Sequence, residues 1–462
     1  MSMKVIKMPK LIDTPPNASN EIKMLSKIGY TLESAISDII DNSITAKCKN
    51  IYIYSLPSDN PTWSIVDDGI GMTPKELCEN MRIGCKDPAK ERELMDLGRF
   101  GSGMKTASIS QANKVTVFSK SKKHKISGAS WDVERISKTK KWMLEVLSSN
   151  ECMDFEDLEH KIIKFSGTQV HWQNLTRYTD DDHKDIESLQ ASDIVSVKSH
   201  IATHFHKFLE GKNKIKISVN GDEISPINPF MSGAGFDGYE VGPEKLLYSR
   251  NGSEISIRAH TIPHWSKLTK AQIEIYGGQT EIRKKQGLYV YRANRLIIDG
   301  GWMGLTNSSN LSDLARIEIN VPVSVDEEWQ TDVKKSSLQL PPLIKAKLRN
   351  LIKLPKKKSR RRYKYRGTKE EENPYWARIE NDRENTVSYE ISNENNELKK
   401  LLKKLNKNEK SLLGAYLKKL SYYLPIASIY YQMSEKPLDL DQEEIERKYK
   451  SGEDIFKKID EQ

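Results

Sequence analysis

Residues 33–46, ESAISDIIDNSITA, combine helical spacing with more acids and amides than a helix that only packs would carry. Residues four apart in a helix differ by about 40° in direction, and residues nine apart by about 180°. Asp38 and Asn42 therefore share a face, whereas Glu33 points away from Asn42. A carboxylate beside an amide suits a magnesium–nucleotide site, because the amide oxygen can bind the metal while the carboxylate orients and deprotonates a water. Capping or surface roles would explain these residues equally well if the segment stood alone.

The segment VDDGIGM offers a second set of candidates. A predicted strand ends at Asp67, and Gly69 and Gly71 alternate after it before Met72. This places a carboxylate at a strand end and lets the backbone approach a flat ligand closely. An ordinary turn is the alternative interpretation, and it is the favoured one for this motif by itself.

The segment GRFGSGMKTAS predicts a loop that binds phosphate. Its glycines leave backbone N–H groups accessible, and Lys105 adds a positive charge at the start of the following helix. The P-loop pattern GxxxxGK[ST] is absent, and we find no preceding strand of the kind that the dinucleotide fingerprint requires. Further along, SGTQV places the Thr168 hydroxyl at the entrance to a predicted strand, where it could reach a base through a water.

These residues need a layered scaffold to bring them together. Helical spacing covers residues 20–47, and alternating apolar residues predict strands at 50–56, 62–66, 114–120, 128–136 and 167–175. A helix, strands, a helix and more strands joined by short turns indicate an α/β layer.

The pattern changes near residue 181. Helical and then strand-like segments predict a second α+β domain over 181–352, after a first domain over 1–180. A basic and then acidic linker follows over 353–396, since such charge runs cannot form a core. Leucines at three- and four-residue steps predict a helical C-terminal module over 397–462. Three histidines in the second domain (His200, His204 and His206) lack further ligands at metal-site spacing, which favours a structural role for them.

Composition sets broad limits on the function. The 462 residues suggest two or three domains, and the net charge of +10 is concentrated in one late block, where residues 353–369 hold ten Lys or Arg. The four cysteines show no CxxC spacing, which favours a reducing compartment. No apolar run approaches the roughly 20 residues that a membrane span requires. We expect a soluble cytoplasmic protein without membrane contact.

Together, the motifs resemble the GHKL ATPase superfamily, which includes gyrase-type topoisomerases, MutL, the ninety-kilodalton heat-shock chaperones, sensor histidine kinases and MORC ATPases. The acid-plus-Asn helix, the DxGxG turn, the GxxGxGxK loop and the late GT occur in family order within residues 38–168. The resemblance implies an α+β chain with a Bergerat α/β sandwich that binds ATP and Mg²⁺.

The resemblance also implies a role for each matching residue. Asp38 would be the general base, Asn42 the Mg²⁺ ligand and Asp67 the acceptor for the adenine amino group, while residues 72–100 would form a lid. The other implied nucleotide contacts are Gly69, Gly71, Met72, Gly98, Gly101, Ser102, Gly103, Met104, Lys105, Thr106 and Thr168.

One residue departs from the family pattern. Hydrolytic members usually carry Glu where this chain has Asp38, and Asp is one methylene shorter. A base must lie within hydrogen-bond reach of its water, so about 1.5 Å of lost reach could slow hydrolysis. The resemblance therefore implies ATP binding more directly than ATP turnover.

The second domain resembles the transducer of MORC and MutL-like ATPases. QGLYVYRANRLI (286–297) is similar to a transducer strand, and EEWQTDVKKSSLQLPP is similar to the loop that sends a lysine to the γ-phosphate. Lys335 and Lys334 are the candidates for that lysine, with a slight preference for Lys335. Two adjacent lysines in a polar loop are otherwise solvated surface.

The resemblance implies an ATPase that dimerises when ATP closes the lid and works in DNA maintenance or in defence against foreign DNA. The basic segment 353–369, which includes Tyr363 and Tyr365, would contact DNA, and protein partners are also expected. A solvated linker is the alternative for this segment.

Three other classes compete with this interpretation. A sensor kinase would need a phosphoacceptor histidine before the site, and the residues before Asp38 include none. A chaperone-like ATPase would need a long middle domain. A non-hydrolysing ATP-binding regulatory subunit of a larger complex is compatible with Asp38.

Overall fold

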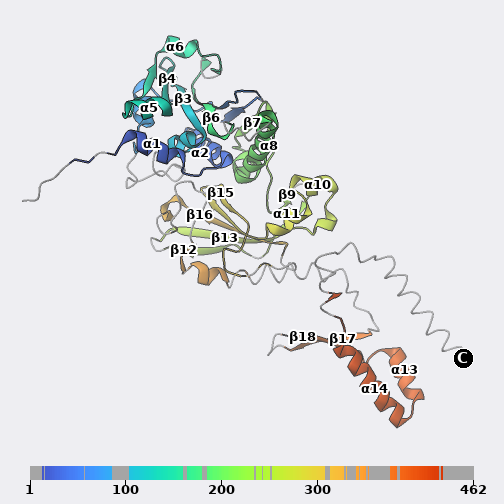
Figure 1. Cartoon of the computed structure of the whole chain (residues 1–462). Helices are drawn as coiled ribbons and strands as arrows, with labels where there is room; N and C mark the ends of the chain where they lie inside the picture. The colour runs from blue at the N-terminus through green and yellow to red at the C-terminus, as the bar shows by residue number, and fades with distance from the viewer. Residues whose placement is uncertain are drawn as a thin grey trace, which may run out of the picture. The chain divides into compact units, whose positions relative to one another are not determined.

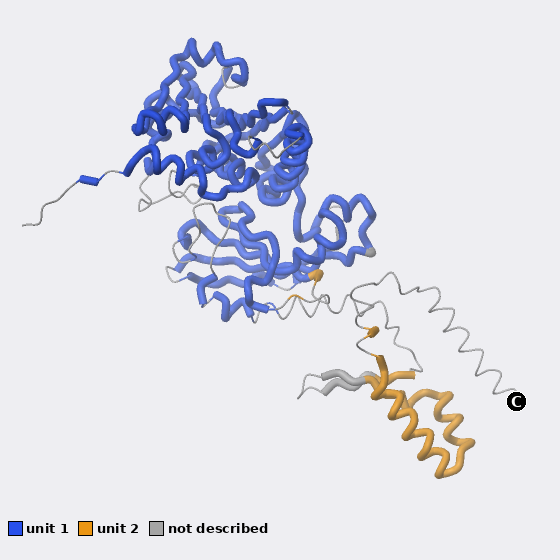
Figure 2. Tube along the Cα trace, viewed as in Figure 1, with its two compact units in different colours: residues 1–307, 315–355 blue, residues 308–314, 356–462 orange. Residues whose placement is uncertain are grey.

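The computed structural model describes residues 13–14, 16–56, 58–85, 103–159, 164–178, 185–233, 236–241, 243–249, 252–306, 308, 313–326, 329, 340–342, 344–349, 352, 375–381, 386–425 and 428–429. The chain divides into two units, which Figure 2 colours separately: Met1–Asn307 with Ala315–Pro355, and Ser308–Leu314 with Lys356–Gln462. No helix in the described part of the chain is both long enough and apolar enough to cross a membrane.

The first unit begins with a mixed sheet in the strand order β5-β4-β3-β6-β2-β1-β7-β8. Its strands are β1 (Asn50–Tyr54), β2 (Trp63–Asp67), β3 (Ala112–Lys120), β4 (Ser127–Asp132), β5 (Glu145–Leu147), β6 (Gly167–Leu175), β7 (Lys216–Val219) and β8 (Asp222–Glu223). Neighbouring strands are antiparallel, except that β1 and β7 run parallel.

Helices pack on one face of this sheet (Figure 1). They include α1 (Ala18–Ser26), α2 (Leu32–Thr45), α4 (Gly103–Gln111), α5 (Val133–Thr139) and α8 (Ile186–His204). Ile51 and Ile53 of β1 join the core beneath these helices, whereas Tyr52 and Tyr54 pack against a smaller cluster that includes Phe118. This alternation is what a strand with two covered faces requires. The α+β fold with an α/β sandwich is confirmed.

Two predicted elements differ from the observed ones. The helical pattern over 20–47 is two helices, because the chain turns at Gly29, whose φ of 60° a residue with a side chain rarely adopts. The strand predicted over 128–136 is wrong beyond Asp132. That side chain accepts a hydrogen bond from the Arg135 backbone and caps α5, so the chain enters a helix there.

The boundary expected at residue 180 does not separate the two sheets. Helix α8 packs on α2, and β7 extends the first sheet through its parallel pairing with β1. The first sheet therefore continues to β8, which ends at Glu223.

The second sheet follows the order β11-β13-β16-β14-β15, with β12 also paired to β13. Its strands are β11 (Tyr239–Glu240), β12 (Lys245–Tyr248), β13 (Glu254–Thr261), β14 (Gly287–Arg292), β15 (Arg295–Asp299) and β16 (Ala315–Val321). Ala293 and Asn294 connect β14 to β15 with φ values of 46° and 70°, as a tight hairpin turn requires. A second core forms on this sheet, with Leu288 and Ile317 among its members.

The remaining elements of the first unit are short. Within the part of the chain that the structure describes, they include α3 (Pro74–Met81), α6 (Ser149–Met153), α9 (His206–Leu209), α10 (Lys270–Ile275), α11 (Gln279–Lys284), β9 (Ser232–Gly233), β10 (Phe236–Asp237) and the 3₁₀ turns η1 (Thr176–Tyr178), η2 (Trp265–Lys267) and η4 (Val323–Val325).

The second unit contains a hairpin, β17 (Trp376–Asn381) with β18 (Thr386–Ile391), followed by helices α13 (Asn396–Lys404) and α14 (Lys407–Tyr422). The helices lie within the module predicted over 397–462, apart from the first residue of α13. The hairpin falls within the predicted linker 353–396, so part of that segment is regular structure. Ser421 of α14 accepts a hydrogen bond of 3.2 Å from the Ile391 backbone and joins the two parts.

Candidate functional site

Asp38 is buried at the centre of α2 and faces the start of α4. The helix begins after Thr31, whose hydroxyl accepts a hydrogen bond from the Ser34 backbone. Tyr30 Oη donates to Asp38 Oδ2 at 3.0 Å. A Cβ atom added to Gly103 would lie 3.3 Å from the same oxygen. Asp38 therefore lies beside the first turn of α4, where the unpaired N–H groups of a helix attract anions.

Asn42 lies one turn further along α2 and is exposed. Its Nδ2 donates to the Asp38 carbonyl at 2.8 Å. Its Oδ1 accepts no hydrogen bond from the residues that the structure describes. An available amide oxygen close to a carboxylate is the donor set that Mg²⁺ prefers, with water completing its shell.

Asp67 ends β2, and its carboxylate accepts several hydrogen bonds. Ser43 Oγ donates to Asp67 Oδ2 at 2.9 Å, and the Gly69 N–H donates to Oδ1 at 2.9 Å. Burial raises the pKa of Asp67 to about 6, although both hydrogen bonds oppose this shift. The sequence prediction did not include Ser43. The sequence feature that could have indicated Ser43 is its position next to Asn42, on the side of α2 that packs on the sheet.

The sheet register brings Thr168 beside Asp67. Thr168 pairs with Asp67 across β2 and β6, and with Ser119 across β3 and β6. Ser119 Oγ lies 2.9 Å from Thr168 Oγ1 and accepts a hydrogen bond of 2.9 Å from the Met72 N–H. Ser119 was missed by sequence reasoning, because a serine near the end of a strand carries no signal until the register is known.

Two glycines let the DxGxG turn lie against its neighbours. A Cβ atom at Gly69 would be 2.8 Å from the Ala46 carbonyl oxygen at the end of α2. Gly71 has a φ of 66°, and a Cβ atom there would lie 1.9 Å from the Lys120 carbonyl oxygen. Larger residues would push the turn away from both α2 and β3.

The comparison with known families agrees with this geometry. Residues 30–164 match the family of histidine kinase-, DNA gyrase B- and HSP90-like ATPases. This segment is a GHKL-type ATPase domain. The match includes Asp38, Asn42 and Asp67, and it ends shortly before Thr168. ATP is the expected ligand of a GHKL domain.

Lys105 of the GHKL domain contacts the backbone at the end of α3. Its Nζ donates to the Asn80 carbonyl at 2.6 Å and to the Arg82 carbonyl, and it lies 3.2 Å from Cys85 Sγ. The lysine thereby connects α4 to the end of α3. Thr106 lies on the same helix, and its hydroxyl donates to the Gly103 carbonyl at 3.2 Å.

Five predicted residues lie outside the described residues. Three belong to the glycine-rich loop and two to the transducer-like loop: Gly98, Gly101, Ser102, Lys334 and Lys335. Met104 follows Gly103 in α4 and packs partly against the core of the GHKL domain.

Of the other two acids of α2, Glu33 faces away from the site, as the helical spacing predicts, whereas Asp41 shares a partner with Asp38. Glu33 accepts a hydrogen bond from Ser196 of α8. Asp41 pairs with Arg295, whose Nη1 also lies 3.3 Å from Asp38 Oδ1. Arg295 belongs to β15 of the second sheet, and sequence reasoning missed it because a contact 257 residues from Asp38 leaves no local pattern.

The histidines that follow the GHKL domain serve its packing. His200 Nε2 lies 3.0 Å from Ser37 Oγ on α2, and the His200 and His204 rings stack with 3.7 Å between their centroids. Burial lowers the pKa of both imidazoles, to about 4 for His204.

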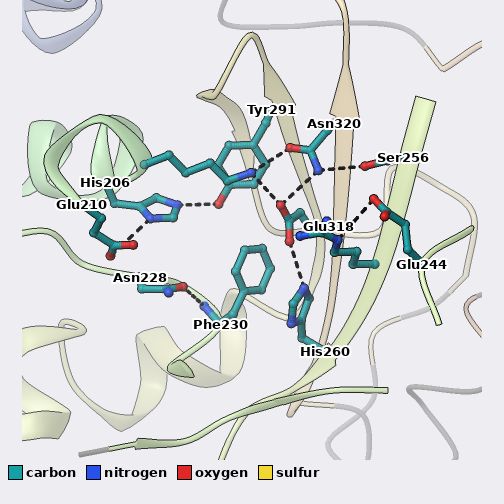
Figure 3. A network of polar contacts seen from close by, with 12 residues as sticks. His206, Glu210, Asn228, Phe230, Glu244, Ser256, His260, Tyr291, Glu318 and Asn320 are labelled. Carbon is teal, nitrogen blue, oxygen red and sulfur yellow. Dashed lines mark hydrogen bonds and ion pairs between the residues drawn. The ribbon is translucent and has the colours of Figure 1, made fainter. Parts of the chain in front are cut away.

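A polar network ties α9 to the second sheet (Figure 3). His206 Nε2 lies 2.7 Å from Tyr291 Oη, and Lys207 Nζ donates to Glu318 at 2.6 Å and to Asn320 at 2.7 Å. Glu318 also lies 3.0 Å from His260 Nε2. The second sheet is therefore joined to α9 by this network and to α2 by Arg295.

Proposed function

We propose that this protein binds ATP and hydrolyses it with Mg²⁺, and that ATP closes two copies of the chain into a clamp. The observation that carries the proposal is the position of α2. This helix places Asp38 at the start of α4 and Ser43 against Asp67, about 7 Å further along its axis. One rigid helix can therefore contact both ends of a single nucleotide.

The adenine end is supported by the acceptor at Asp67. An ionised Asp67 can accept a hydrogen bond from the exocyclic amino group of adenine, while Gly71 lets the base lie against the backbone. The hydroxyls of Thr168 and Ser119, 2.9 Å apart, can hold a water that contacts the ring.

The phosphate end is supported by Asp38, Asn42 and α4. The Asn42 Oδ1 would hold Mg²⁺, which supplies positive charge at the phosphate oxygens when it is bound. Asp38 would orient the attacking water and accept its proton. The first turn of α4 and Lys105 would hold the phosphates, together with Gly98, Gly101 and Ser102.

The second sheet would act as a MORC- or MutL-like transducer. Lys335 or Lys334 would reach the γ-phosphate, so that the two sheets respond together to the nucleotide. Two contacts support this coupling. Arg295 connects the second sheet to α2, which carries Asp38. Lys207 connects the second sheet to α9, which follows α8, the helix that packs on α2.

DNA is the proposed target, in DNA maintenance or in defence against foreign DNA. The ten cations of residues 353–369 provide the positive charge that phosphate backbones attract. Protein partners would direct this activity.

The test compares ATP turnover in the wild type, Asp38→Asn and Asn42→Ala. Glu33→Gln is the matched control, because Glu33 lies on the same helix but faces α8. We expect both site variants to lose about 100-fold or more in kcat and the control to keep it. If the wild type hydrolyses ATP no faster than Asp38→Asn does, the ATPase hypothesis is wrong. The alternative is then a non-hydrolysing ATP-binding subunit.

That second candidate has one observation in its favour: both carboxylate oxygens of Asp38 already face donors, Tyr30 and Arg295. The clamp is tested separately by gel filtration with a non-hydrolysable ATP analogue. A chain that stays monomeric with and without the analogue would eliminate it.

A further inference from the structure

Arg295 places a guanidinium between two carboxylates of α2. Its Nη1 donates to Asp41 Oδ2 and lies 3.3 Å from Asp38 Oδ1. The three side chains are almost completely buried, with Arg295 3%, Asp38 2% and Asp41 1% exposed. A buried charge needs a close partner, so these residues form one electrostatic unit.

The hairpin that carries Arg295 is held on both sides. The preceding strand ends with Arg292, whose Nε and Nη2 each lie 2.7 Å from a carboxylate oxygen of Asp326. The Arg295 guanidinium lies 5.4 Å from the centre of the Phe205 ring, next to α9. The second sheet thus fixes the position of the Arg295 guanidinium, and the guanidinium contacts the carboxylates of α2.

The two oxygens of Asp38 face different surroundings. Oδ1 lies toward Arg295, whereas Oδ2 accepts the Tyr30 hydroxyl and lies toward Gly103 at the start of α4. The oxygen on the expected phosphate side is therefore Oδ2. Arg295 contacts the carboxylate through Oδ1, the oxygen that does not face the expected phosphate side.

Asp41 is the main partner of the guanidinium. Charged N–H···O contacts are usually about 2.7–2.9 Å long, so the 3.3 Å contact with Asp38 is a long one. Arg295 can therefore stay bound to Asp41 while it orients Asp38 through the longer contact.

We propose that Arg295 is a positioning residue for the hydrolysis of ATP: from the second sheet it orients the Asp38 carboxylate, so that Oδ2 faces the water. This inference rests on the proposed ATPase function. It also makes the base depend on docking of the second sheet, because Arg295 belongs to β15.

The test measures ATP turnover by the full chain with Arg295→Gln and Arg295→Lys. We expect Arg295→Gln to lose about 10- to 100-fold in kcat while KM for ATP changes less than about threefold, because only the base is disturbed. Arg295→Lys retains the charge and should restore most of kcat. Arg258→Gln, an exposed arginine of the same sheet, is the control and should match the wild type.

Folding is checked by thermal unfolding and by ATP binding. If the single variant Arg295→Gln unfolds, the double variant Arg295→Gln/Asp41→Asn is used instead. It removes one charge of each sign, so that Asp38 is the only charged residue left of the three. The same loss of kcat is expected in the double variant. Turnover that is unchanged or faster without the guanidinium overturns the inference and leaves the ATPase intact. A wild type with no turnover above that of Asp38→Asn overturns the ATPase and the inference together.

Discussion

At the scale of single residues, the buried carboxylate of Asp67 lowers the stability of the folded chain, and its proposed contact with adenine would explain why it is there. The carboxylate is buried, and burial raises its pKa from 3.8 to about 6. Between these values the folded chain binds the proton more tightly than the unfolded chain does. Stability therefore falls as pH rises through this range, and ionised Asp67 costs about 3 kcal/mol at neutral pH. The same charge makes Asp67 a strong acceptor for an adenine amino group.

Asp67→Asn should therefore change the stability of the folded chain and its affinity for ATP in opposite directions. We expect the nucleotide-free variant to gain up to about 3 kcal/mol in unfolding free energy at pH 7, and to bind ATP about 10- to 100-fold more weakly. Urea unfolding and calorimetric titration with ATP measure the two effects. ATP affinity of the wild type should also fall as pH drops below about 6, because protonation removes the negative charge that makes Asp67 a strong acceptor.

The control is Asp68→Asn, which changes the neighbouring acid. Asp68 is exposed and accepts hydrogen bonds from the backbones of Lys49 and Asn50, so this variant should lose stability and bind ATP normally. Equal ATP affinity in wild type and Asp67→Asn would remove Asp67 from the adenine site.

Sequence reasoning selected candidate site residues that lie in short motifs. Helical spacing alone indicated that Asp38 and Asn42 share a face and that Glu33 turns away. Tyr30, Ser119 and Arg295 were missed, because their contacts depend on loop geometry, strand register and long-range packing.

At the scale of elements, Lys105 links α4 to the end of α3 through two backbone carbonyls. Binding phosphate would require the ammonium to exchange these carbonyls for phosphate oxygens. Lys105→Met keeps the apolar stem of the side chain and removes the charge. We expect ATP affinity to fall about 10- to 100-fold in calorimetric titration.

The exposed Lys138 on α5 provides the control, and Lys138→Met should bind ATP as the wild type does. If Lys105→Met binds ATP normally but unfolds more easily, the lysine only anchors α3.

Breaking the network between α9 and the second sheet should lower the free energy of unfolding. Burial would raise the pKa of Glu318, but hydrogen bonds from His260 and Lys207 and the charge of Lys207 outweigh it and place the pKa below its ordinary 4.5. The stabilisation by this carboxylate is therefore present above about pH 4.5 and is lost as pH falls further. Glu318→Gln should cost about 3 kcal/mol at pH 7, since it leaves the largely covered Lys207 without the carboxylate that it contacts.

Urea unfolding at pH 7 measures this loss. The comparison is Glu244→Gln, which removes an exposed partner of Arg258 and should change stability by less than about 1 kcal/mol. A loss of similar size in both variants would show that the buried network adds nothing beyond a surface pair.

Periodicity predicted most elements of the first sheet and failed at two junctions. Gly29 divides one helical pattern into two helices, and Asp132 turns a strand pattern into a helix by capping it. Both junctions depend on a single residue, so a window of alternating or helical spacing does not reveal them.

At the scale of the whole molecule, the positive charge of residues 353–369 predicts DNA binding that weakens with salt. Replacing six of its cations by glutamine should lower DNA affinity and flatten the dependence of log K on log salt by about one unit for each cation that contacts phosphate. The six are Lys356, Lys357, Lys358, Arg360, Arg361 and Arg362. Fluorescence anisotropy with duplex DNA at several salt concentrations measures both quantities.

A matched control removes the same charge from the helices α13 and α14. Its six exposed lysines are Lys399, Lys400, Lys403, Lys404, Lys407 and Lys410. If both variants lose affinity equally, net charge rather than the basic segment governs DNA binding.

The parallel pairing of β7 with β1 determines where the chain can be cut. A fragment ending at residue 180 would leave β1 as an open edge strand and strip α8 from α2, and exposed strand edges recruit other chains. A fragment that continues past Glu223 would keep both β1 neighbours. Light scattering should reveal aggregation of the shorter fragment only, so the smallest independent nucleotide-binding piece is longer than the motifs themselves.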